Sequence, residues 1–156
     1  MPLEPTRHVE RLRTWRGTLP VANRYTYGPA AERFFRALKD DARLLGTRCG
    51  RCGITYVPGR LFCERCFDEL NEWTEVGPAG TVEAVTTVHW GPDGSRLERP
   101  VLLTLVRLDG ADTVVFHYLG DVAPADVRIG LRVRPAFKPP EERTGSILDI
   151  VHFAPA

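Results

Sequence analysis

The four cysteines of this chain form two Cys-x-x-Cys pairs, and thiolates at this spacing bind metal ions. The proposed ligands are Cys49, Cys52, Cys63 and Cys66. Ten residues separate the pairs, fewer than the roughly fifteen to twenty typical of this pattern, but enough for a hairpin that brings two metal knuckles together. Gly53 suits the tight turn of the first knuckle because glycine adopts positive φ, whereas Phe67 suits the equivalent place less well. Four thiolates complete a tetrahedron around Zn²⁺ and leave no open position for water, so we predict one structural zinc ion per chain.

Two other interpretations of the cysteines are less favoured. Two structural disulfides need an oxidising compartment, but Met1–Pro5 lacks the basic and apolar regions of a secretory signal. A thioredoxin-like redox centre uses one Cys-x-x-Cys at the start of a helix, whereas here two pairs lie among turn and aromatic residues. We therefore expect reduced, metal-binding cysteines and a cytoplasmic location.

Length and composition limit the classes of function. The chain has 156 residues, of which 43% are apolar, enough for the core of one domain or two small ones. Its 21 Lys and Arg residues against 20 Asp and Glu residues give a net charge of +1, which argues against a general nucleic-acid binder. It contains no run of about eighteen apolar residues, so no membrane span is predicted.

The N-terminal part divides into an extended arm and a helix. Residues 1–28 have proline and glycine at both ends and a basic centre; they are interpreted either as a partly disordered terminus or as a strap that docks Trp15 onto a partner. Residues 29–46 show apolar residues at helical spacing, with charged residues mostly outside the apolar stripe. Pro29 suits the first turn and Gly46 the termination of this amphipathic helix.

A local basic patch accompanies the cysteines. Between residues 43 and 65 there are five arginines and one acid, Glu64. Arginine binds phosphate well, so the patch indicates either a phosphate-bearing ligand or simply solvated charges that offset the thiolates. The helix adds two adjacent phenylalanines that cannot both face the centre of its stripe. The candidate residues for contact with such a ligand or with a partner are Trp15, Phe34, Phe35, Arg43, Arg48, Arg51 and Arg60.

The remainder reads as a zinc ribbon over residues 47–76 and a β domain over 77–156. Five strand-like runs are predicted, over residues 81–90, 101–108, 113–119, 131–138 and 147–153, with one helical turn between Val122 and Arg128. This is the inventory of a five-stranded OB-type barrel. Because periodicity does not give strand order, a five-stranded sandwich remains open. The predicted fold class is mainly β, with an N-terminal helix, a zinc ribbon and a barrel.

Several of these segments together resemble a known family. They are the helix ending in Leu-Leu-Gly, Cys-Gly-Arg-Cys-Gly, Tyr-Val-Pro, Phe-Cys-Glu-Arg-Cys, Glu-Trp-Thr-Glu-Val, Gly-Thr-Val and Asp-Val-Arg-Ile-Gly. From about residue 29 onward the chain is similar to acyl-CoA-associated proteins that join a rubredoxin-like zinc ribbon to an OB fold. Within that family it resembles the small accessory subunits of thiolases and thiolase-like aldolases, including that of benzoylsuccinyl-CoA thiolase.

The resemblance implies a non-catalytic subunit of a hetero-oligomer, which stabilises a thiolase-fold catalytic subunit and helps to position acyl-CoA. We accordingly predict no catalytic residue in this chain: every cysteine is assigned to metal, and neither Ser95 nor Ser146 lies in a nucleophile elbow. The alternatives are a stand-alone acyl-CoA-binding protein and a zinc-ribbon/OB protein that binds single-stranded nucleic acid. The last would stack bases on aromatic residues such as Trp90, Phe116 and Tyr118.

Overall fold

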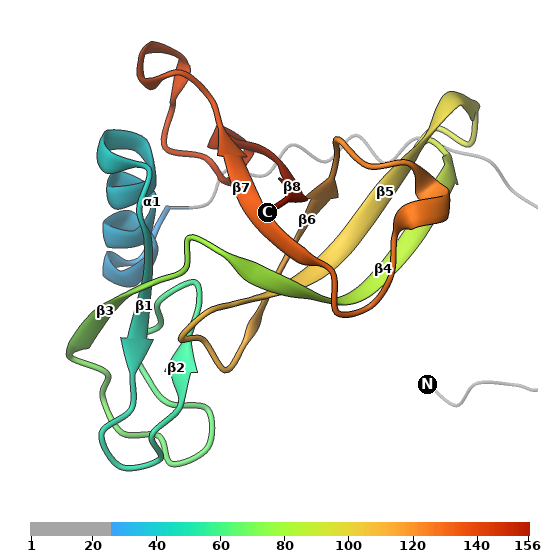
Figure 1. The fold of residues 1–156 in the computed structure, drawn as a ribbon. Coiled ribbons are helices and arrows are strands. Elements are labelled where there is room, and N and C mark those ends of the chain that lie inside the picture. The colour runs from blue at the N-terminus through green and yellow to red at the C-terminus, as the bar shows by residue number, and fades with distance from the viewer. Residues whose placement is uncertain (1–25) are drawn as a thin grey trace, which may run out of the picture.

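The computed structural model describes residues 26–156, which form one helix, a small three-stranded sheet and a five-stranded barrel (Figure 1). Its main elements, in chain order, are α1 (Pro29–Asp41), β1 (Leu44–Arg48), β2 (Thr55–Tyr56), β3 (Glu72–Val76), β4 (Gly80–Trp90), β5 (Arg96–Leu108), β6 (Val114–Leu119), β7 (Arg132–Phe137) and β8 (Ile150–Pro155). The mainly β fold class is confirmed. None of the described helices has the length and apolar character needed to span a membrane.

Helix α1 ends earlier than predicted. Pro29 opens it as expected, but Ala42 adopts the left-handed conformation with φ 54° and stops it. The amides of Ala42 and Arg43 then bond back to the last turn, so the predicted extent of 29–46 is wrong at its C-terminal end. Leu44 is buried in β1 instead. Gly46 lies within that strand, where a Cβ atom would come 2.7 Å from the carbonyl oxygen of Tyr56.

The zinc ribbon is built on the sheet β2-β1-β3, in which both pairings are antiparallel. β1 pairs along its whole length with β3, from Leu44 opposite Val76 to Arg48 opposite Glu72. Thr47, fully buried, uses its hydroxyl both to donate to the carbonyl oxygen of Arg60 and to accept from the amide of Arg60. Both cysteine pairs therefore lie in the connections between the strands of a short, hydrogen-bonded sheet, which is beside the barrel (Figure 1).

The barrel closes in the order β4-β5-β6-β8-β7, which resolves the choice between a barrel and a sandwich. β4 pairs with both β5 and β7, and β8 lies between β6 and β7, parallel to the former. β6 alternates exposed and buried residues along its length, as expected for a strand with one face in the core. The predicted helical turn is a 3₁₀ turn at Pro124–Asp126.

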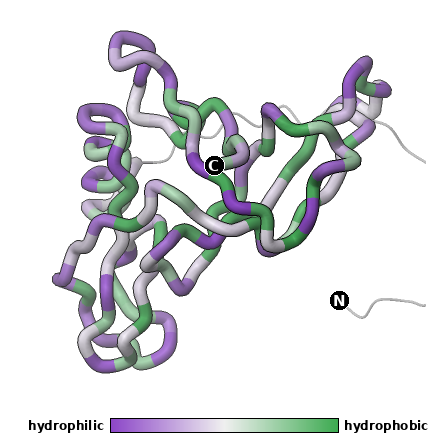
Figure 2. The backbone as a smooth tube through the Cα atoms, viewed as in Figure 1, coloured by the Kyte–Doolittle hydropathy of each residue, from purple (hydrophilic) through white to green (hydrophobic). Residues whose placement is uncertain are grey.

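One hydrophobic core joins the helix, the ribbon and the barrel. It includes Phe34 and Leu38 of α1, Val76 of the ribbon, and Val106 and Phe153 of the barrel, all nearly or completely buried. Figure 2 shows hydrophobic residues along much of the barrel strands and hydrophilic residues at the β4–β5 turn and at the loop that precedes β8. The helix and ribbon are thus fixed to the barrel by shared burial.

Candidate metal centre and apolar cavity

The four cysteines form one cluster, whose Sγ atoms all lie within 4.8 Å of one another. The Sγ atoms of Cys49 and Cys66, one from each pair, are 3.6 Å apart. Tetrahedral coordination with Zn–S bonds of about 2.3 Å requires sulfur separations of about 3.8 Å. The donor set therefore fits Zn²⁺, with Cys49, Cys52, Cys63 and Cys66 as the residues that would hold it, and the ion would crosslink the ribbon.

The two knuckles share one backbone pattern. In the first, the amide of Gly53 bonds to the carbonyl oxygen of Cys49 at 2.7 Å; in the second, Phe67 bonds likewise to Cys63 at 2.9 Å. Both turn residues have positive φ, 72° at Gly53 and 61° at Phe67. The predicted positive φ at Gly53 is confirmed, and Phe67 adopts the same conformation, in which a phenylalanine carries a steric cost that glycine avoids.

Tyr56 contacts the cysteine cluster through a hydrogen bond. Its ring is fully buried and its Oη lies 3.2 Å from the Sγ atom of Cys63. This hydrogen bond outweighs the opposing effect of burial and lowers the pKa of Cys63 to about 6, while it raises the pKa of Tyr56 to about 12. Because the thiolate is the form that binds metal, the Tyr56 hydroxyl favours a metal-ready Cys63. Sequence reasoning missed this residue, since Tyr56 is brought to Cys63 only by the fold of the ribbon.

The candidate contact residues are placed very differently. Phe34 is completely buried, so its ring offers no surface to CoA or a partner in this conformation. Phe35 is half-buried and packs against Tyr27, with ring centroids 5.0 Å apart. Trp15 lies outside the described residues. For Phe35 and the arginines, contact with CoA or a partner stays a prediction.

The arginines of the predicted basic patch are largely paired with carboxylates. Arg43 lies 2.8 Å from Asp41 and 3.6 Å from Glu75, and Arg51 lies 3.5 Å from Asp68. Arg60 pairs with Glu64, and Arg48 bonds to the hydroxyl of Thr55 at 3.4 Å. Most of the acids lie outside the 43–65 segment, so the sequence segment looked more basic than the folded surface is.

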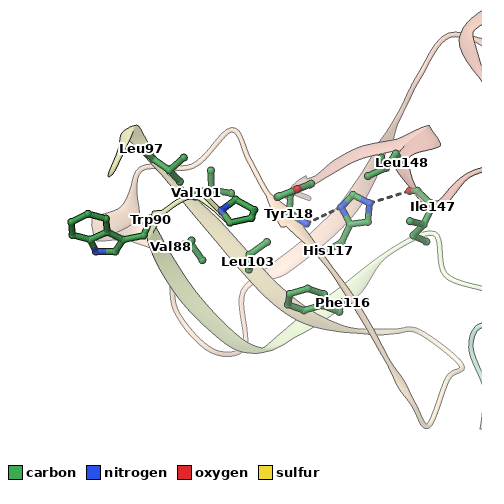
Figure 3. A pocket seen from close by; sticks show the side chains of 12 residues that line it. Val88, Trp90, Leu97, Val101, Leu103, Phe116, His117, Tyr118, Ile147 and Leu148 are labelled. Atoms are coloured by element: carbon green, nitrogen blue, oxygen red, sulfur yellow. Dashed lines mark hydrogen bonds between the residues drawn. The ribbon is translucent and has the colours of Figure 1, made fainter. Parts of the chain in front are cut away.

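A cavity of about 580 Å³ opens on the barrel, lined by residues of β4, β5, β6 and the segment before β8. Three aromatic residues, Trp90, Phe116 and Tyr118, contribute to it, and each residue is 43–61% exposed. Figure 3 shows the lining side chains as a row from Trp90 at one end to Ile147 at the other. The sequence had indicated these aromatics as available, but not that they lie together.

His117 forms part of the cavity wall and is almost completely buried. Its Nδ1 accepts from the amide of Tyr118 at 2.8 Å, which leaves Nε2 to donate to the carbonyl oxygen of Ile147 at 3.0 Å (Figure 3). Burial is the main cause that lowers the pKa of His117. The imidazole is therefore neutral at physiological pH and ties β6 to the segment before β8.

Asp149 holds the turn before β8, which carries the cavity residues Ile147 and Leu148. Its carboxylate is fully buried and accepts from the amides of Thr144, Gly145 and Ser146 at 2.7–3.1 Å. Burial alone raises the pKa of Asp149, but these backbone donors overcome it, so the pKa lies below its ordinary value. The turn that carries Ile147 and Leu148 is thereby held in one conformation.

Two family matches cover the site. Residues 36–72 match the rubredoxin-like zinc ribbon domain of ChsH2, and residues 73–138 match the C-terminal OB-fold domain of ChsH2. Together they span well over half of the chain, adjoin at the start of β3, and include all four cysteines. The chain belongs to the DUF35/ChsH2 family.

Other members of the DUF35/ChsH2 family are similar over most of their lengths. A "DUF35 domain-containing scaffold protein" of Methanocaldococcus jannaschii is 28% identical over 111 residues, which are 68% of this chain and 75% of that protein. A crystal structure of a DUF35 protein of unknown function from Sulfolobus solfataricus is 29% identical, with a TM-score of 0.58 over 69% of this chain and 78% of that one. A structure titled "Ltp2-ChsH2(DUF35) aldolase" matches with a TM-score of 0.61 and 23% identity, over 85% of this chain and 98% of that one.

The geometry of this DUF35/ChsH2 barrel does not match a single-stranded nucleic-acid site. Such sites combine stacking aromatics with a positive groove that follows the phosphates. Trp90, Phe116 and Tyr118 do share one cavity, but its lining residues, all in the described part of the chain, include no lysine or arginine. The grouped aromatics thus share a mostly apolar lining that lacks the positive charge of such a site.

Proposed function

We propose that this chain is the non-catalytic accessory subunit of a thiolase-type acyl-CoA enzyme complex. In this role it stabilises a thiolase-fold catalytic subunit and helps to position the acyl-CoA substrate. The observation that carries the proposal is the shared architecture with a chain of the Ltp2-ChsH2(DUF35) aldolase, which extends over 98% of that chain. The scaffold name of the Methanocaldococcus jannaschii relative supports the same role.

The chemistry of the described residues supports a scaffold. Acyl transfer by a thiolase needs a nucleophilic thiol, and all four cysteines of this chain belong to the metal cluster. The hydroxyl of Ser95 is bonded to Asp93 in a turn, and both nitrogens of His117 are used in the fold. These groups hold structure, so the reacting groups would come from the partner.

The partner is proposed to be a thiolase or a thiolase-like aldolase, and the two leave different products. A thiolase cleaves a 3-ketoacyl thioester with CoA as the acceptor, whereas an aldolase releases a carbonyl product without added CoA. Assay of the complex with and without CoA therefore identifies the class of the partner. We also propose a cytoplasmic location, where reduced thiols remain available to zinc.

The proposal is tested by co-expressing the chain with the thiolase-fold protein encoded nearest to it. We expect the two to co-elute on a sizing column and the catalytic subunit to lose activity or stability when expressed alone. Separate elution together with undiminished activity of the lone catalytic subunit would contradict the proposal. If the two proteins eluted separately and this chain alone bound acyl-CoA tightly, the stand-alone acyl-CoA-binding alternative would replace the proposed accessory role.

A further inference from the structure

The four cysteines of the metal cluster differ in their access to solvent. Cys49 and Cys63, the first members of the two pairs, are completely buried. Cys52 and Cys66, the second members, are half-buried. A thiol that coordinates a metal is deprotonated, so all four ligands of a bound zinc ion are thiolates, the nucleophilic form of cysteine. Solvent access then decides which of them a dissolved oxidant reaches, and this favours the second member of each pair.

The second knuckle, which contains Cys66, carries backbone strain that the first knuckle lacks. Phe67 has φ 61°, a left-handed conformation that is costly for a residue with a Cβ atom, whereas Gly53 has the equivalent place in the first knuckle. Phe67 is also 79% exposed, so burial of its ring offsets little of this cost. Such strain persists only where other interactions hold the backbone, here the bond from the Phe67 amide to Cys63 and the metal ligands beside it. The second knuckle should therefore open more readily than the first and expose Cys66.

A second thiolate lies next to Cys66 across the cluster. The Sγ atoms of Cys66 and Cys49 are 3.6 Å apart, so an oxidised sulfur on Cys66 is within reach of Cys49. Cys49 belongs to the other pair, and it is buried, so it is protected from direct attack by an oxidant. A bond between these two sulfurs would join the two knuckles directly. The ribbon would then keep a crosslink at the place where the metal had held it.

We propose that Cys66 is a site of reversible oxidation by hydrogen peroxide, with Cys49 as the thiolate that resolves it. The Sγ atom of Cys66 attacks one peroxide oxygen, the O–O bond breaks and hydroxide leaves, which gives a sulfenic acid. The Cys49 thiolate attacks that sulfur, the S–O bond breaks and a second hydroxide leaves. Two thiolates thus lose two electrons to form one disulfide, and peroxide gains them. With two of its four donors removed, the cluster no longer holds zinc.

The test uses the zinc-loaded full chain and hydrogen peroxide in slight molar excess. Released zinc is followed with the chromophoric chelator pyridylazoresorcinol, and free thiols are blocked with N-ethylmaleimide before digestion. Arginines lie between the four cysteines, so trypsin places each cysteine in a peptide of its own. Mass spectrometry should find the Cys49 and Cys66 peptides linked, with one zinc ion released per disulfide.

Three results of this experiment would overturn the proposal. The first is a disulfide that forms initially within a pair, either Cys49–Cys52 or Cys63–Cys66. The second is retention of zinc after peroxide treatment. The third is failure of dithiothreitol and added zinc to restore the reduced, metal-bound protein. None of these results bears on the proposed function, since the complex with a catalytic subunit is measured separately.

Two variants of Phe67 separate backbone strain from shielding by the ring. Phe67→Gly relieves the strain and should slow zinc release by peroxide roughly fivefold, the factor that corresponds to about 1 kcal/mol. The matched control is Phe67→Ala, which removes the ring but keeps a Cβ atom at positive φ, so it should release zinc at least as fast as the wild type. Neither variant alters a metal ligand, so both should bind zinc. Equal rates in the two variants would overturn the role given to strain.

The crosslink is tested by hydrogen exchange at the amides of β1 and β3, which pair in the ribbon. We expect the peroxide-treated chain to keep much of its protection there, because the disulfide replaces the metal as a link between the knuckles. The reduced chain treated with a chelator serves as the comparison and should lose that protection. Equal loss in the two samples would show that the disulfide does not hold the ribbon.

Discussion

Thr55 and Asp112, 57 residues apart in the chain, hydrogen-bond to each other in both directions. The amide of Thr55 donates to Oδ2 of Asp112 at 2.8 Å, and the amide of Asp112 donates to the carbonyl oxygen of Thr55 at 2.9 Å. Next to them, the hydroxyl of Thr113 accepts from the amide of Val57 at 2.7 Å and donates to its carbonyl oxygen at 3.0 Å. These four bonds attach the zinc ribbon to the loop between β5 and β6.

Removal of the Asp112 carboxylate should destabilise the protein at this attachment. Asp112→Ala leaves the buried amide of Thr55 without an acceptor, which costs about 1–3 kcal/mol. Urea unfolding should show the loss, and hydrogen exchange should become faster at the Thr55 amide. The matched control is Asp112→Asn, whose carbonyl oxygen retains an acceptor and should restore most of the stability. If Asp112→Ala and Asp112→Asn unfold alike, the carboxylate does not hold the ribbon.

Zinc should be required for the folded ribbon. We expect one zinc ion per purified chain, measured by inductively coupled plasma mass spectrometry. Cys49→Ser or Cys63→Ser should give insoluble or unfolded protein, because a structural zinc site contributes folding free energy directly. A chelator should have the same effect on the wild type, and added zinc should reverse it. A soluble, folded and metal-free cysteine variant would contradict the structural role.

Loss of the Tyr56 hydroxyl should weaken zinc binding without unfolding the ribbon. Tyr56→Phe keeps the buried ring but removes the donor to the Sγ atom of Cys63. Partners of this kind typically change metal affinity by about 10–100-fold, which competition with a chromophoric chelator will measure. Tyr118→Phe serves as the control, since that residue lies on the barrel. Identical zinc affinity in both variants would show that the hydroxyl does not support the metal.

The Asp149 carboxylate should make stability depend on pH in the acidic range. Its pKa is lower in the folded protein than the ordinary value of 3.8, so the unfolded chain takes up the proton first. The stabilisation is complete above about pH 5 and is lost as the pH falls through and below that ordinary value. Asp149→Asn should therefore cost about 1–3 kcal/mol near neutral pH. This difference from the wild type should shrink in acid.

The control for Asp149 is Glu141→Gln, an exposed residue of the same loop. Guanidinium unfolding of the wild type and both variants at about pH 7 and about pH 3 gives the free energies of unfolding that the comparison needs. Glu141→Gln should follow the wild type at both values. A difference between wild type and Asp149→Asn that stays constant with pH would show that the charge on Asp149 is not what stabilises the turn.

The metal ligands and the order of elements were predictable because their signals are local. Two Cys-x-x-Cys pairs, the turn glycine at residue 53 and the alternation of β7 all lie within short windows of sequence. The helix was predicted too long for the same reason: Leu44 and Leu45 continue the helical period, but they pair with Val76 and Glu75 of β3. The pairing partner, β3, is distant in sequence, so the residues near Leu44 do not indicate it.

The supporting contacts could not be predicted, since each joins residues distant in sequence. Tyr56 reaches Cys63, Asp112 reaches Thr55, and His117 reaches Ile147 only when the fold is complete. The cavity was missed likewise, because its walls come from three separate segments. The sequence shows that acids follow the basic segment, but not that Asp68 and Glu75 pair with its arginines. Composition gives the numbers of arginines and carboxylates, whereas the charge of a surface depends on which of them pair in the fold.

The position of β8 between β6 and β7 has a consequence for the order of events during translation. The residues of the zinc ribbon, through Val76, leave the ribosome well before β8 does, since synthesis proceeds from the N-terminus. A nascent chain can therefore bind zinc early, while β6 and β7 still lack the strand that bridges them. Until β8 emerges, both strands have free edges that other chains can pair with. The metal site can therefore mature first, whereas the barrel strands stay open to pairing with other chains until β8 is made.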